Sequence, residues 1–199
     1  MVPNIPWVEY PRLLSIDPGG DTIGFAISEW DMCRGLIRPL HAFTHRVDQS
    51  LRREYKYLED HYDPLDIRMV CIHDVVSRLY RDWGIWQVAH ETPFMGSFAQ
   101  AYASLTAVCT QIRQAAIRHY PPLPVFGYSP SEVKRAVGVP GRSNDKSLMF
   151  EAIQRCPHLD LSRIHETLQE LDEHSVDAIA VAVAHYKTHW EDFPCDTWY

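Results

Sequence analysis

The sequence feature that most constrains the fold is a short apolar run that ends on an acid and leads into a tight turn. Residues 13–16 are mostly apolar, and Asp17 follows them directly. Residues 18–21 contain a proline and two glycines, which is typical of a turn. Residues 23–28 are apolar again. This pattern predicts a β-hairpin whose first strand delivers Asp17 at its end.

The rest of the chain reads as alternating strands and helices. Further strands are predicted at 36–44, at 86–90 with Glu91 just past the end, and at 123–128. Helices are predicted at 46–61, 66–83, 99–120, 131–134, 145–155 and 172–189. Strands therefore come first and then alternate with helices, which indicates an α/β domain with a mixed sheet. We assign residues 1–189 to one domain and 190–199 to an aromatic, acidic C-terminal tail.

Composition limits the class of protein. Hydrophobic residues make up 46% of the 199 residues, enough for a full core. No apolar run reaches the roughly 18 residues that span a bilayer, and the proline-containing N-terminus does not resemble a signal peptide. The five cysteines are scattered and form no C-x-x-C pair, so we expect reduced thiols without structural zinc. These features predict a cytoplasmic protein without a membrane partner.

The formal net charge of −7 counts against nucleic-acid binding, which usually favours a basic chain. The distribution of charge matters more than the sum, because a nuclease must gather carboxylates around its metals. Between residues 113 and 146 basic side chains outnumber acidic ones. The basic residues are Arg113, Arg118, Lys134, Arg135, Arg142 and Lys146, against Glu132 and Asp145.

Three acids stand at the ends of separate predicted elements: Asp17, Glu91 and Asp177. Each is flanked by apolar residues, where a charge is costly unless it is paired or binds a metal. Mg²⁺ fits such a cluster because it prefers oxygen ligands and substrate phosphates. His174 precedes Asp177 by three residues, on the same face of a helix, and could ligate a metal or transfer a proton. The alternating alanines after Asp177 would let this helix approach the sheet.

Each of these residues also has a plainer interpretation when it is taken alone. Asp17 could be a turn residue, Glu91 a charge at a strand end, and Asp177 the partner of a nearby base. His174 could be a surface histidine of its helix. The order in which all four occur is what favours a common site. His185 and His189 have the spacing of metal ligands, but we interpret them as surface residues.

Four segments in this order resemble the RuvC-type Holliday junction resolvases of the RNase H-like superfamily. The hairpin Leu13-Leu14-Ser15-Ile16-Asp17-Pro18-Gly19 with Ile23-Gly24-Phe25-Ala26 is similar to the family's first motif. His90-Glu91-Thr92-Pro93-Phe94 is similar to the second, and residues 129–134 with 141–146 resemble the basic region. His174-Ser175-Val176-Asp177-Ala178-Ile179-Ala180 resembles the closing helix. Two departures are an expanded segment before Glu91 and a tail after His189 without a counterpart.

The resemblance implies an RNase H-like fold, a mixed five-stranded sheet flanked by helices. It also implies a homodimer that cuts four-way and other branched DNA in recombination and repair, with two Mg²⁺ or Mn²⁺ ions per site. Asp17, Glu91, His174 and Asp177 would hold the metals, and water would attack the phosphate in line. No nucleotide cofactor is implied. The protein would act at the nucleoid, or in an infected host cell if the member is viral.

The resemblance also assigns DNA contacts. Lys134, Arg142 and Lys146 would neutralise backbone phosphates, and Lys146 would in addition stabilise the transition state. Phe94 would wedge into base stacks at the junction centre, which suits an aromatic ring because every base offers a π-face. Plainer alternatives are a solvated helix face for Lys134 and a core position for Phe94.

Two other classes of protein remain alternatives. A hairpin of this kind also occurs in sugar-kinase and chaperone ATPases, but these chains normally need two related domains and a second phosphate loop. The other alternative is a catalytically silent DNA-binding module, against which the intact set of Asp17, Glu91, His174 and Asp177 argues.

Overall fold

The computed structural model describes residues 10–31, 33–95, 99–141, 146–164, 166 and 170–191. The strands are β1 (Arg12–Asp17), β2 (Thr22–Asp31), β3 (Leu36–Arg46), β4 (Gln87–Glu91) and β5 (Val125–Tyr128). The α-helices of the described residues are α1 (Val47–Glu54), α2 (Pro64–Trp83), α3 (Ala99–Arg118), α4 (Pro130–Ala136), α5 (Lys146–Arg155) and α6 (Glu173–His189). The described residues also form the short 3-10 helices η1 (Lys56–Leu58) and η2 (Leu161–Arg163).

The strands form one mixed sheet in the order β3-β2-β1-β4-β5. Strand β2 pairs antiparallel with both β1 and β3, whereas β4 is parallel to β1 and β5 is parallel to β4. Parallel neighbours need a crossover, and α2 and α3 provide these crossovers. The predicted mixed five-stranded sheet flanked by helices is therefore confirmed. Strand β1, which ends on Asp17, is the central strand and lies between β2 and β4.

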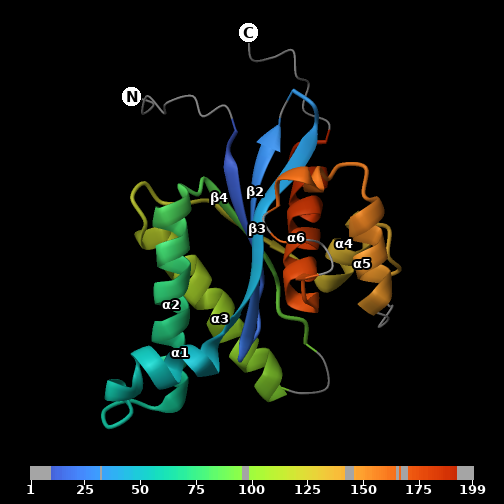
Figure 1. The fold of residues 1–199 in the computed structure, drawn as a ribbon. Coiled ribbons are helices and arrows are strands. Elements are labelled where there is room, and N and C mark those ends of the chain that lie inside the picture. The colour runs from blue at the N-terminus through green and yellow to red at the C-terminus, as the bar shows by residue number, and fades with distance from the viewer. Residues whose placement is uncertain are drawn as a thin grey trace.

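The helices form a layer on each side of the sheet. Figure 1 shows α1, α2 and α3 on one side and α4, α5 and α6 on the other. The alternation of β1 separates the two cores: Leu14 and Ile16 pack under α2 and α3, whereas Leu13 packs under α6. Each such fully buried aliphatic side chain stabilises the fold by roughly 1.5–3 kcal/mol. By the same period of two, Asp17 projects toward the α6 side.

Helix α6 lies unusually close to the sheet. Its buried alanines keep the packed surfaces of the helix small, with Ala178 and Ala182 on one face and Ala180 and Ala184 on another. A Cβ atom at Gly24 of β2 would lie only 2.0 Å from the carbonyl oxygen of His174, so this position accepts only glycine. The predicted approach of this helix to the sheet is confirmed, and it sets the height at which α6 residues stand over β1.

Some boundaries and one environment differ from the predictions. The helix predicted at 46–61 ends at Glu54 and is followed by η1, because Tyr55 leaves the helical conformation. The interpretation of His185 as a surface residue is wrong: it is fully buried and stacks on Trp30 at 5.5 Å. Its Nδ1 lies 2.6 Å from the Tyr128 hydroxyl and its Nε2 lies 2.9 Å from Gln87 Oε1. In the part of the chain that is described, no helix has the length and hydrophobicity to cross a membrane.

His185 predicts a pH dependence of stability. Burial lowers its pKa from 6.5 to about 3, so below pH 6.5 the unfolded chain takes up a proton that the folded protein excludes. The stability that this histidine allows at neutral pH is therefore lost progressively as the pH falls. Between pH 7 and pH 5 we expect a loss of about 2 kcal/mol from this group. Urea unfolding of wild type and His185→Gln at both pH values measures it, and an equal loss in both proteins would contradict it.

Candidate active site

Two carboxylates come together because their strands are neighbours and parallel. Asp17 ends β1 and Glu91 ends β4, and the preceding residues Ile16 and His90 are direct partners in the register. Since Ala89 packs on the α6 side of the sheet, Glu91 two residues later projects to that same side. Asp17 and Glu91 therefore leave adjacent strands at one edge and on one face.

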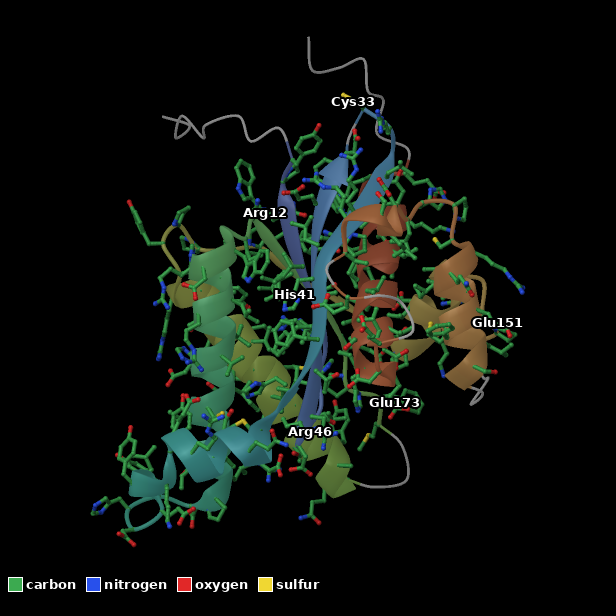
Figure 2. The ribbon with its side chains drawn as sticks, in the orientation of Figure 1. Arg12, Cys33, His41, Arg46, Glu151 and Glu173 are labelled. Carbon is green, nitrogen blue, oxygen red and sulfur yellow. The ribbon has the colours of Figure 1, made fainter. Side chains whose placement is uncertain are left out.

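The third acid, Asp177, lies in the second turn of α6. Asp172 caps this helix, since its Oδ1 accepts from the Ser175 backbone N–H at 3.0 Å and also from the Thr44 hydroxyl. Figure 2 labels Glu173, which begins α6, at the same end of the molecule as Arg46, which ends β3. The cap fixes where α6 starts, and hence where His174 and Asp177 lie.

The pKa values of Glu91 and Asp177 respond to the neighbouring acids. Burial raises the pKa of Glu91 to about 8, with further increases from Asp17 and Asp177 and an opposing effect from Lys134. Burial likewise raises the pKa of Asp177 to about 6, and the charge of Asp17 adds to this. His174 and Lys134 act in the opposite direction on Asp177. The cluster is therefore a site of unfavourable like charge that a cation would relieve.

His174 bonds to the first acid, and its side chain is only partly exposed. Its Nδ1 lies 2.9 Å from Asp17 Oδ2, and this hydrogen bond raises the pKa of the imidazole. Its Nε2 lies 3.1 Å from the hydroxyl oxygen of Thr22, the first residue of β2. The sequence did not single out Thr22; the only indication was its place just after the turn that follows Asp17.

The donor set suits a divalent metal, although it is not drawn into a closed coordination shell. Among the residues that the structure describes, no group of three or more His, Cys, Asp or Glu side chains is arranged to hold an ion. The chemistry nevertheless fits: buried carboxylates on adjacent elements repel one another, and Mg²⁺ is bound through such oxygens. Asp17, Glu91 and Asp177 are the residues that would hold it, with His174 beside them.

Comparison with known proteins identifies the family. The protein-family model described as crossover junction endodeoxyribonuclease RuvC matches residues 13–185 of this sequence. The chain belongs to this family. The RuvC of Thermomicrobium roseum is 25% identical over 185 residues, which cover 88% of this chain and 93% of that relative.

Solved structures agree at the level of the fold. Thermus thermophilus RuvC superposes with a TM-score of 0.62 at 19% identity, covering 89% of this chain and 95% of that one. The fowlpox virus resolvase, solved with Holliday junction DNA, gives a TM-score of 0.56 at 12% identity, with 89% and 97% covered. The sheet order and the two helical layers are thus shared with RuvC-type proteins.

The predicted DNA contacts of this RuvC-family chain fall into two groups. Lys134 lies in α4, whose start is fixed by a capping box between Ser129 and Glu132, and its charge reaches Glu91 and Asp177. Phe94 follows β4 and is 72% exposed, so the alternative of a core position is wrong. Arg142 lies outside the described residues. Lys146 begins α5, and its side chain is outside the described part of the chain.

A charge-removing substitution in this site should stabilise the metal-free protein. Glu91→Gln removes a buried carboxylate that Asp17 and Asp177 repel, and we expect the melting temperature to rise by about 2–8 °C. Because the folded protein holds the Glu91 proton up to about pH 8, the wild type loses stability as the pH rises, and the gain is larger at pH 9 than at pH 6. Calorimetry in EDTA measures this. Equal melting temperatures at pH 9 would disprove the repulsion.

Proposed function

We propose that this RuvC-family endonuclease cuts four-way and other branched DNA with two Mg²⁺ ions, or Mn²⁺ in their place, at the cluster of Asp17, Glu91 and Asp177. The observation that supports this most is that Asp17 and Glu91 end adjacent parallel strands on the face of the sheet that α6 covers, with Asp177 in α6. The charges of Asp17 and Asp177 accordingly raise the pKa of Glu91. Such a cluster lowers the stability of the fold unless a cation neutralises the carboxylates. The bound cation can then hold a substrate phosphate.

The residues divide the work by position. Asp17, whose charge acts on both other acids, would hold both ions, Glu91 one of them, and Asp177 with His174 would complete the site. When bound, the ions would neutralise the scissile phosphate and activate water for in-line attack. Lys134, close enough to affect the pKa of Glu91, would neutralise a neighbouring backbone phosphate. The reaction would leave 5′-phosphate and 3′-hydroxyl ends, with Lys146 and Arg142 as further phosphate contacts.

Branched DNA as the substrate and a homodimer as the active form complete the proposal. Thermus thermophilus RuvC and the fowlpox virus resolvase have both been solved with Holliday junction DNA. A two-fold dimer would present two equal active sites to a junction and cut two strands symmetrically.

Cleavage of a labelled four-way junction tests the proposal. The junction and a linear duplex of matched sequence are incubated with wild type or Asp17→Asn, in Mg²⁺ or in EDTA. We expect paired nicks near the branch point, absent in EDTA and reduced at least about 1,000-fold in Asp17→Asn, whose junction binding persists. Equal cutting of the linear duplex would make the protein a general nuclease. Absence of cutting with both Mg²⁺ and Mn²⁺ would favour the silent DNA-binding module.

The exposed ring of Phe94 predicts a contribution that depends on the branch. If it stacks on bases at the junction centre, Phe94→Ala should lower junction cleavage by about 5- to 150-fold, the equivalent of roughly 1–3 kcal/mol of stacking. Phe94→Trp should retain most of the activity. Tyr120→Ala is the matched control, because Tyr120 is 94% exposed but follows the far end of α3. Equal losses in both alanine variants would contradict the wedge.

A further inference from the structure

We propose that Thr22 is a positioning residue, whose hydroxyl holds the His174 ring so that Nδ1 faces Asp17 and the ion bound there. This inference rests on the proposed metal-dependent function and concerns the same site. Its basis is the contact between Thr22 Oγ1 and His174 Nε2 at 3.1 Å, on the side of the ring opposite Asp17.

Three contacts fix the position of His174. The backbone of this residue packs on Gly24, where the His174 carbonyl leaves no room for a Cβ atom. Its Nδ1 lies 2.9 Å from Asp17 Oδ2, and its Nε2 meets Thr22. The carboxylate of Glu173 is 3.7 Å from the same Nε2 and is too distant for a hydrogen bond. Thr22 is therefore the group that decides how the far side of the ring is oriented.

Thr22 is itself held firmly. It begins β2 and pairs with Arg46 of β3, so its backbone belongs to the sheet. The preceding turn folds directly over it, since a Cβ atom at Gly19 would lie 2.0 Å from the Thr22 carbonyl oxygen. The turn that follows Asp17 thus also places the hydroxyl that orients the partner of Asp17.

The chemistry of the pair explains why a hydroxyl is suited to this position. A neutral imidazole carries a proton on one nitrogen and a lone pair on the other. A histidine that turns one nitrogen toward a metal commonly donates its other N–H to a neighbouring oxygen, which fixes both tautomer and orientation. When a metal occupies the site, Thr22 Oγ1 can accept the Nε2–H, which leaves the Nδ1 lone pair for the ion. In the metal-free protein Nδ1 instead donates its proton to Asp17 Oδ2, since a carboxylate can only accept. Valine has nearly the same shape but cannot accept this proton.

Metal affinity and ring contact can be measured separately. Thr22→Val removes the hydroxyl and Thr22→Ser keeps it, in the full-length protein. We expect Mn²⁺, followed by electron paramagnetic resonance, to bind about 10- to 100-fold more weakly to Thr22→Val, and nearly as in wild type to Thr22→Ser. Junction cleavage by Thr22→Val should lose kcat with little change in KM, because the DNA contacts are unaltered. Thr110→Val is the control, since its hydroxyl bonds only to the backbone oxygen of Thr106 within α3.

A measurement without metal separates this inference from the proposed function. In the nuclear magnetic resonance spectrum of the metal-free protein, recorded at a pH that protonates both ring nitrogens, the His174 Nε2–H signal should be protected from exchange in wild type and Thr22→Ser, and lost in Thr22→Val. Unchanged exchange, unchanged Mn²⁺ affinity, or a serine variant as weak as the valine variant would each overturn the inference. A wild type that binds no Mn²⁺ and cuts no junction would overturn the proposed function, while the exchange data would still decide the role of Thr22. Should Thr22→Val not fold, Thr22→Ala is judged by the same criteria.

Discussion

The close contact between the start of α6 and β2 is the constraint on which the rest of the site depends. The carbonyl oxygen of His174 occupies the space that a side chain at Gly24 would fill. This approach lowers α6 until His174 reaches Asp17 of the neighbouring strand. A larger residue at position 24 would lift the helix and separate the two halves of the site, although the remainder of the sheet would be untouched.

Once α6 is in place, the site works against the stability of the fold. Asp17, Glu91 and Asp177 are brought together by strands and a helix whose packing is dominated by apolar residues. Burial and mutual repulsion then raise the pKa of Glu91 and of Asp177. A protein designed only for stability would not assemble three carboxylates here, whereas one that binds a divalent cation and phosphate requires it. The electrostatic cost is therefore an argument about function.

The sequence predicted those parts of the molecule that depend on local pattern. Alternation and spacing predicted the hairpin whose first strand ends on Asp17, the strand that leads to Glu91 and the alanine-rich helix over the sheet. The structure confirms all three elements. The environment of His185 could not be predicted this way, because its burial depends on Trp30 and Tyr128, which are distant in the chain. The contact of Thr22 with His174 could not be predicted for the same reason, because the two residues are 152 positions apart in the chain. The roles assigned to all the site residues, Arg142 and Lys146 included, remain predictions.

The segment between β3 and β4 also has a structural role at the site, and it belongs to the stretch before Glu91 that we predict to be expanded relative to the family. The backbone N–H of Val47, at the start of α1, donates to the carbonyl of Asp21 at 2.9 Å. Arg68 of α2 reaches the Asp21 carboxylate at 2.8 Å. Both contacts fall on the turn that connects Asp17 to Thr22, so two helices of this segment brace the turn from one side. Because Asp21 is 73% exposed, the ion pair itself is weak, and the backbone hydrogen bond is the firmer of the two supports. Helices α1 and α2 thus stabilise the geometry of the first acid.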